Sequence, residues 1–251
     1  MAAPRAPRLS LSRLVPNLLT LAAICAGLTS IRFAIEGRVD QAIGLIILAA
    51  VLDGMDGRLA RILKSESAIG AELDSLADFL NFGVATGLLV FFTLLSAETG
   101  LGWIAVLIYV ICCVMRLARF NVGSKTPDPD AIPGYFTGVP SPAGALLALM
   151  PIAVDRAFPG MTPTSGVIVA FWLIFVGWLL ISHIPTPSLK LVRLRRDRMH
   201  YIFVGMIAAG AILFTWPWHA LVALNLLYLG VVLWSFSRRQ RRGPKRRPDE
   251  T

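Results

Sequence analysis

The sequence predicts an all-α integral membrane protein, a bundle of about eight transmembrane helices with both termini in the cytoplasm. Of its 251 residues, 56% are hydrophobic and only 16% are charged, whereas a soluble domain carries about 25% charged residues. The mean hydropathy is +0.69. The apolar residues fall in runs long enough to cross a bilayer as helices, which takes about 20 residues. This composition argues against a soluble enzyme, a disordered protein and a nucleic-acid-binding module.

Eight apolar runs predict the individual spans. The first run has no small-residue cleavage site and is too long for the core of a signal peptide, so we expect it to be retained. Several runs contain Pro or Gly, which helices in lipid tolerate where neighbours satisfy the freed backbone groups. The runs lie at residues 14–34, 42–63, 71–95, 101–121, 139–155, 164–184, 199–215 and 217–236.

The distribution of Lys and Arg predicts the orientation. With the N-terminus inside, 21 of the 24 basic residues fall in cytoplasmic segments, including seven in the tail at residues 237–251. Cytoplasmic segments carry this excess in membrane proteins, and both termini inside requires an even number of spans. We expect the tail to contact anionic lipid headgroups. The three cysteines lie in apolar runs without metal-ligand or disulfide spacing and are predicted to pack in the interior.

Four aspartates mark the chemistry of the chain. Asp53 and Asp56 lie three residues apart at the end of the second run, and Asp74 and Asp78 lie four apart at the start of the third. Residues at these spacings share one face of a helix. Two antiparallel helices joined by a short turn therefore bring all four carboxylates to one membrane depth. Ionisable residues inside a span are costly and are functional by default.

Carboxylates this close repel one another unless cations lie among them. Oxygen ligands suit Mg²⁺, Mn²⁺ or Ca²⁺, and the absence of neighbouring His or Cys argues against zinc. Gly57 and Ala60 leave little side chain on the same face, so a ligand or another helix can approach the backbone. A divalent cation beside small residues near the membrane surface is suited to a diphosphate. The alternative interpretation is a set of helix-end charges that face water.

The spacing of these residues resembles a known family. The pattern D-x2-D-G-x2-A-R-x8-G-x3-D-x3-D is matched at every fixed position, and it is similar to the motif of the CDP-alcohol phosphatidyltransferases, membrane enzymes that make phospholipids. The matching residues are Asp53, Asp56, Gly57, Ala60, Arg61, Gly70, Asp74 and Asp78.

The resemblance implies a fold and a set of roles. It implies one helical membrane domain over residues 1–251, usually dimeric, with a catalytic core at about 15–145 and its site at the cytoplasmic face of the cell membrane. The four aspartates would hold divalent cations, Mg²⁺ or Mn²⁺ and two per site, and Asp78 would also act as general base. The residues implied to bind CDP-diacylglycerol are Asn17, Thr20, Asp53, Gly57, Ala60, Arg61, Gly70 and Asp74.

Two further segments bear on the acceptor alcohol. The fourth run ends in RLARFN at residues 116–121, and the fifth opens with FTGVPSPAG at residues 136–144. Together they resemble the phosphatidylserine synthase branch of the family. Arginines at i and i+3 share a face and suit an anionic group, although arginines also collect at cytoplasmic span ends. The residues implied for a serine pocket are Arg116, Arg119, Asn121 and Ser141.

On this interpretation the substrates are CDP-diacylglycerol and L-serine, and the products are phosphatidylserine and CMP. The expected partners are these substrates, membrane lipids and a second copy of the chain, with no nucleic acid. The same chemistry with glycerol 3-phosphate or inositol phosphate as acceptor stays open. A cation transporter is a more distant alternative, since such a site lies near the midplane and often recurs in repeated halves.

Overall fold

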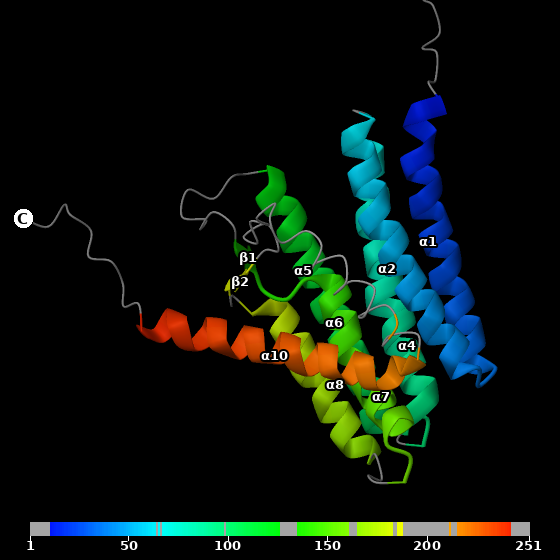
Figure 1. Ribbon diagram of the computed structural model, residues 1–251, viewed down its shortest axis with the longest axis vertical. Helices are drawn as coiled ribbons and strands as arrows, with labels where there is room; N and C mark the ends of the chain where they lie inside the picture. Colours follow the sequence, from blue (N-terminus) through cyan, green and yellow to red (C-terminus); the bar gives the residue numbers. More distant parts are fainter. Residues whose placement is uncertain are drawn as a thin grey trace, which may run out of the picture. The chain divides into compact units, whose positions relative to one another are not determined.

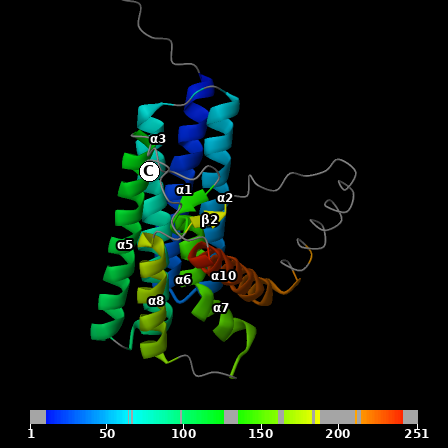
Figure 2. The same cartoon turned by 90° about the vertical axis from the view of Figure 1, so that its left-hand side faces the viewer.

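The computed structural model describes residues 11–63, 65, 67–97, 99–125, 135–160, 165–182, 185–187, 211 and 215–241. The chain divides into two compact units, Met1–Ser96 and Ala97–Thr251. The predicted helical class is confirmed, because helices make up almost all of the described residues (Figures 1 and 2). Within the described residues, four helices are long and apolar enough to cross a membrane: Val15–Ile35, Ala68–Leu95, Gly100–Gly123 and Pro217–Trp234.

The number of spans and the orientation of the termini stay predictions. The run expected at residues 199–215 falls almost entirely outside the described residues, as does the tail beyond residue 241. The other expected runs correspond to helices whose ends lie within a few residues of the predicted ones, except where the fifth run is interrupted.

The first unit is built on the helix pair α1 (Leu11–Ile35) and α2 (Val39–Ile62), which lie side by side in Figure 1. Small side chains let the two backbones approach closely, as is usual between helices in lipid. Ala23, Ala26 and Ala49 are buried together in this interface. The Ser30 hydroxyl donates to the Ala42 carbonyl across it at 2.8 Å. These contacts fix the position of α2 along α1, and α2 carries the first two aspartates.

The turn between α1 and α2 is tied down by charge. Gly37 has φ +73°, a conformation that glycine adopts without strain. Glu36 accepts from Arg32 at 2.8 Å and from Arg38 at 3.2 Å. The hydrogen bond from Arg32 is the largest cause of a lowered pKa of the Glu36 carboxyl, and Arg38 adds to it. The paired charges keep this end of the helix pair polar.

The remainder of the first unit is one continuous helical run with two wider turns. It comprises α3 (Ala68–Asp78), the π-helical η1 (Phe79–Ala85), α4 (Thr86–Val90) and the π-helical η2 (Phe91–Leu95). Ser67 begins α3, and its hydroxyl accepts from the Gly70 N–H at 3.0 Å, an ordinary N-cap. The π turns follow directly after Asp78, where wider turns often accompany functional residues.

In the second unit, α5 (Thr99–Lys125) packs along α8 (Gly166–Ile181). A side chain at Gly177 would lie only 3.3 Å from the Tyr109 Cα and the Cys112 Sγ, so glycine allows the two helices to approach closely. Cys112 and Cys113 are both buried, as predicted, but the prediction is wrong for Cys25, which is exposed on α1. The indole N–H of Trp172 on α8 donates at 2.8 Å to the carbonyl of Leu147, which connects α8 to the earlier helix α6 (Ser141–Ala148).

The fifth predicted run forms two short helices instead of one, α6 (Ser141–Ala148) and α7 (Met150–Ala157). Pro151 occupies the first turn of α7, where its missing N–H is tolerated, whereas inside one long helix it would break the hydrogen bonding. A short ribbon was not predicted either. β1 (Tyr135–Thr137) pairs antiparallel with β2 (Pro185–Pro187), with Tyr135 opposite Pro187.

The last described helix, α10 (Pro217–Arg241), packs against α7 and crosses α6 (Figures 1 and 2). Leu221 and Val222 are buried against Ala153 and Ala157 of α7. The Phe158 and His219 rings meet edge to face at 5.2 Å. These contacts fix which face of α10 points into the second unit.

Candidate active site

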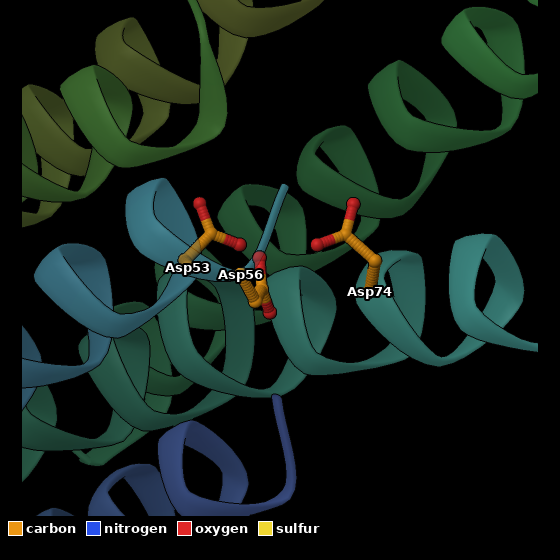
Figure 3. Close-up of side chains that lie close together, drawn as sticks. All are labelled: Asp53, Asp56 and Asp74. Atoms are coloured by element: carbon orange, nitrogen blue, oxygen red, sulfur yellow. The ribbon is translucent and has the colours of Figure 1, made fainter. Parts of the chain in front are cut away.

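The first unit brings Asp53, Asp56 and Asp74 together, as the spacing predicted. Each offers a carboxylate oxygen, and the three oxygens lie within 4.8 Å of one another. Figure 3 shows Asp53 and Asp74 pointing toward one another from α2 and α3, with Asp56 between them. The arrangement follows from the two helices, because α2 presents both of its aspartates on the face that meets the start of α3.

Asp56 is the most deeply buried of the three, with 3% of its surface exposed. The Thr20 hydroxyl of α1 lies 2.5 Å from its Oδ2 and 3.1 Å from the Pro16 carbonyl. A hydroxyl has one proton, so the shorter contact to the carboxylate is the main hydrogen bond. The second oxygen of Asp56 is buried and has no hydrogen-bond partner among the described residues.

Asp78 also belongs to the cluster. The Asp53 carboxyl lies within hydrogen-bonding range of both Asp74 and Asp78, and it feels the charge of Asp56 as well. All four predicted aspartates therefore gather around Asp53, although the set of three within 4.8 Å does not include Asp78. The charges of this cluster have to be balanced by protons or by cations.

The donor set fits a divalent cation. Carboxylate oxygens are the ligands that Mg²⁺ and Mn²⁺ prefer, and the three oxygens are close enough to bind one ion together. A buried carboxylate oxygen without a partner costs free energy, and the second oxygen of Asp56 is such an atom in the described part of the chain. Coordination of an ion would satisfy it. The cluster could therefore hold a metal.

Small residues flank the cluster, as expected. A side chain at Gly57 would meet nothing within 4 Å, so this face of α2 is open to a ligand. Gly70 is different, because a side chain there would lie 3.1 Å from the Asn17 Oδ1. Asn17 of α1 thus packs beside the start of α3. Arg61 is exposed, and its Nε donates to the carbonyl of Gly57 at 3.0 Å.

Ala60 completes the predicted set on α2 and is half-buried one turn beyond Asp56. Thr20 and Asn17, which the family motif does not contain, are placed beside Asp56 and Gly70 respectively. The structure thus places Thr20 in contact with Asp56 and Asn17 beside Gly70, whereas the assignment of the full set to CDP-diacylglycerol stays a prediction.

The residues predicted for the acceptor lie in the second unit. Arg116 of α5 donates through Nη1 to the buried hydroxyl of Ser141 at the start of α6. Arg119 instead donates through Nη1 to the Ile181 carbonyl, the last of α8, at 2.8 Å. Asn121 is half-buried near the end of α5. The structure therefore brings Arg116 and Ser141 together and engages Arg119 with a helix end.

Two polar residues of α10 with buried side-chain atoms were not predicted. Asn225 is 2% exposed, and Tyr228 is half-buried with its hydroxyl oxygen buried. Their sequence signal is weak, because each is a single polar residue in an apolar run. The spacing of three residues, which places both on the buried face, is the only sign that could have identified them.

The chain is similar to curated proteins named CDP-diacylglycerol–serine O-phosphatidyltransferase. The Mycobacterium leprae relative is 42% identical over 231 residues, which cover 90% of this chain and 75% of the relative. The Mycobacterium tuberculosis relative is 42% identical over 75% of this chain and 66% of its own length, so the match leaves a third of that protein uncovered. The Helicobacter pylori relative is 32% identical over 89% of this chain and 92% of its own length.

A family model described as CDP-alcohol phosphatidyltransferase matches residues 13–184. This match covers more than half of the chain and includes the acidic cluster and Arg116 with Ser141. It favours phosphatidyl transfer over cation transport for the acidic cluster. Together with the relatives, it shows that this chain belongs to the CDP-alcohol phosphatidyltransferase family.

Proposed function

We propose that this protein transfers the phosphatidyl group of CDP-diacylglycerol to the hydroxyl of L-serine, releasing CMP and forming phosphatidylserine. The observation that carries the proposal is the cluster of Asp53, Asp56 and Asp74 at the family's motif positions. The choice of serine is supported by relatives that carry this activity in their names and align with most of the chain.

The acidic cluster would bind the diphosphate of CDP-diacylglycerol through Mg²⁺ or Mn²⁺, two ions per site. A bound divalent cation neutralises charge on the diphosphate and on the departing CMP. Asp53, Asp56 and Asp74 would hold the ions, and Thr20 would orient the Asp56 carboxylate through its 2.5 Å hydrogen bond. Gly57 and Ala60 would leave room for the nucleotide to lie against α2.

Asp78 would act as the general base. Its carboxylate takes the proton of the serine hydroxyl, the serine oxygen forms a bond to the lipid-linked phosphorus, and the bond from that phosphorus to CMP breaks. Carboxylates perform this role when they lie within hydrogen-bonding range of the hydroxyl. Asp78 is suited to it because it borders the cluster without being one of the three carboxylates that converge most closely.

The setting of the reaction follows from composition. We propose a multi-pass protein of the cell membrane whose site faces the cytoplasm, where L-serine and CMP are soluble, and whose active form is a homodimer. The bias of Lys and Arg toward one side, including the basic tail, supports this orientation. Membrane lipids would surround the exposed apolar side chains of the four long helices.

The experiment that tests the function is CMP release by the purified chain. The protein is supplied with CDP-diacylglycerol in mixed micelles and with Mg²⁺ or Mn²⁺. Serine, glycerol 3-phosphate and inositol phosphate are offered separately. We expect release with serine alone. Release with a phosphorylated alcohol instead would retain the acidic-cluster chemistry and reject serine as the acceptor, and the absence of release with all three would reject the transferase activity.

A further inference from the structure

The C-terminal end of α8 lies inside the second unit, where its last carbonyl groups need hydrogen-bond donors from outside the helix. The final four carbonyls of an α-helix have no partner within it. Leu179 and Leu180, at this end of α8, are both buried. Because a buried carbonyl without a donor costs free energy, the groups around this helix end have to supply donors.

The donors come partly from the helix end itself and partly from α5. The Ser182 N–H donates to the Trp178 carbonyl at 3.0 Å, and the Ser182 hydroxyl donates to the Leu179 carbonyl at 2.7 Å. The carbonyl of Ile181 is reached from another helix, because Arg119 of α5 donates to it through Nη1 at 2.8 Å. The negative end of the helix dipole also favours a cation at this position. Arg119 therefore caps α8.

The segment that leads into α6 packs on the same helix end. The Val139 N–H donates to the Leu179 carbonyl in a long hydrogen bond of 3.5 Å. Gly138 has φ +84°, and a side chain there would lie 2.8 Å from the carbonyl oxygens of both Leu180 and Ser182. Glycine adopts this conformation without strain and leaves room for the two backbone oxygens. The ribbon of β1 with β2 lies at this end of α8 (Figure 1).

The start of α6 continues the contact along α8. A side chain at Gly144 would lie 2.5 Å from the Leu180 Cδ2, so the two helices approach closely here. Ser141 is the first residue of α6, and its buried hydroxyl accepts from Arg116. Arg116 and Arg119 lie one turn apart on α5. One face of α5 thus contacts both the start of α6 and the end of α8.

We infer that Arg119 is a positioning residue of the acceptor site, which caps α8 and so holds residues 138–141 in place instead of binding the acceptor itself. The inference rests on the proposed function, because it concerns the site that would bind serine. It separates the two arginines of RLARFN, which have the same signal in the sequence. Arg116 donates to the start of α6, whereas Arg119 donates to a backbone carbonyl.

Removal of the cap would leave residues 138–141 in their observed position for only part of the time. The apparent affinity for a ligand falls with the fraction of molecules in the competent arrangement. Loss of a hydrogen bond from a charged donor corresponds to about a tenfold change in such an equilibrium. The KM for serine should rise by that factor. Turnover at saturating serine should stay near the wild-type value, because bound serine selects the ordered arrangement.

The test measures hydrogen exchange and kinetics on the full chain in detergent. In Arg119→Met, the Val139 amide should exchange about tenfold faster in the substrate-free protein, and the KM for serine should rise about tenfold. The KM for CDP-diacylglycerol should not change. Arg119→Lys should stay within about threefold of the wild type in both measurements, since an ammonium group can also donate to the last carbonyls of a helix.

Gly138→Ala is an independent way to displace the same segment. It should reproduce the rise in the KM for serine, and combining it with Arg119→Met should add little, because both changes act through one contact. Gly160→Ala is the matched control. Gly160 has φ +80°, but a side chain there meets nothing within 4 Å. The backbone strain is similar in the two alanine variants, so a difference between them reports the contact with α8.

The kinetic and exchange results together distinguish a cap from a ligand. A raised KM for serine in Arg119→Met with unchanged exchange, which lysine does not restore, would overturn the inference, because it would indicate direct bidentate binding of the carboxylate. An unchanged KM for serine would overturn it too. An equal loss of turnover and of affinity for both substrates would also overturn it, since it would indicate a general packing role.

Two further results keep the inference separate from folding and from the proposed function. If gel filtration shows that Arg119→Met is not folded, a tenfold rise in the KM for serine in Arg119→Lys, or a wild-type KM in Gly138→Ala, would overturn the inference. Should the wild-type chain use only a phosphorylated alcohol, the proposed function fails. Faster exchange of Val139 in Arg119→Met would then still support the cap, and unchanged exchange would overturn it.

Discussion

The two units of this protein each contain a buried polar cluster, but the clusters are assembled in different ways. In the first unit, four aspartates within residues 53–78 converge from α2 and the helix that follows it. In the second unit, Arg116 of α5 donates to the buried hydroxyl of Ser141 at the start of α6. The first cluster is encoded by local spacing, whereas the second depends on how distant helices pack.

This difference in assembly parallels a difference in charge. The acidic cluster places several negative charges together and can be stable only with protons or cations among them. The pair of Arg116 and Ser141 combines one positive charge with a neutral hydroxyl, so it is suited to an anion. We therefore expect substitutions in the acidic cluster to abolish most of the activity. Substitutions around Arg116 should instead weaken acceptor binding in steps, as individual hydrogen bonds are lost.

The largest expected effect is the loss of metal ligands in the first unit. Asp53→Asn, Asp56→Asn and Asp74→Asn should each lower CMP release by about 1,000-fold or more, because several kcal/mol of charge stabilisation depend on the bound cation. Mg²⁺ or Mn²⁺ should also raise the thermal unfolding midpoint of the wild-type chain, since a ligand that binds only the folded state stabilises it. The variants should lose this shift. Asp40→Asn, on the same helix but outside the cluster, is the control, and a full metal shift in all three variants would contradict the ligand assignment.

Asp78 provides a sharper test within the same cluster. Asp78→Asn should abolish turnover while CDP-diacylglycerol still binds, since the amide occupies the same volume but cannot accept the serine proton. Turnover is followed by CMP release and binding by the increase in thermal stability that CDP-diacylglycerol produces. Near-normal turnover would show that another group serves as base. Loss of binding together with turnover would instead assign Asp78 to the metal site.

Arg116 is expected to produce a smaller loss, confined to the acceptor. Arg116→Gln should raise the KM for serine about 100-fold, because the serine carboxylate would lose a partly buried, charged hydrogen-bond donor. Arg116→Lys should fall between the wild type and this variant, since it retains the charge but loses the planar donor geometry. The KM for CDP-diacylglycerol should stay constant in both variants, because the first unit is expected to bind that substrate. Arg156→Gln, an exposed arginine of α7, controls for the loss of a positive charge, and an equal rise in both KM values would remove the distinction between the two clusters.

The family motif made the acidic cluster predictable, because every residue it needs lies on two helices that follow each other in the chain. Thr20 was implied as a site residue by the family resemblance, but its hydrogen bond with Asp56 depends on how α1 packs against α2 and was not predicted. The burial of Asn225 could not be predicted in the same way. It depends on which face of α10 is buried, and contacts between α10 and α7 determine that face.

The fold shows the same limit. Hydropathy located the helices because length and composition are local properties. The break between α6 and α7 was missed, although Pro151 was visible, because proline in a membrane helix either bends it or ends it according to its neighbours. The ribbon of β1 with β2 joins segments about 50 residues apart, and its prolines argue against a strand in any local analysis.

Substitution of Thr20 measures how far the orientation of the Asp56 carboxylate affects the rate of CMP release. Thr20→Val retains the shape of the side chain but removes the hydroxyl that donates to Asp56, and a lost hydrogen bond to a charged group corresponds to about a tenfold lower rate of CMP release. Thr29→Val is the matched control, because Thr29 lies on the same helix and its hydroxyl donates only to the Cys25 carbonyl among the described residues. Equal effects of the two variants would show that the contact with Asp56 has no special role.

The smallest expected effect concerns packing beneath the acidic cluster. Gly27 of α1 lies directly against the side chain of Asn81 in η1, which is 1% exposed, and a side chain at Gly27 would lie 3.5 Å from the Asn81 Cα. Gly27→Ala should therefore lower the thermal midpoint by about 5 °C, corresponding to an overpacking cost of about 1–3 kcal/mol. Gly44→Ala, where a side chain meets nothing within 4 Å, should not lower it. Asn81→Ala combined with Gly27→Ala should recover most of the loss, as expected when one contact causes it.

The single Gly27 variant should also affect activity, because Asn81 lies one turn after Asp78. We expect it to lower CMP release severalfold while the KM for serine stays unchanged. A rise in the KM for serine alone would show that the two clusters are not independent.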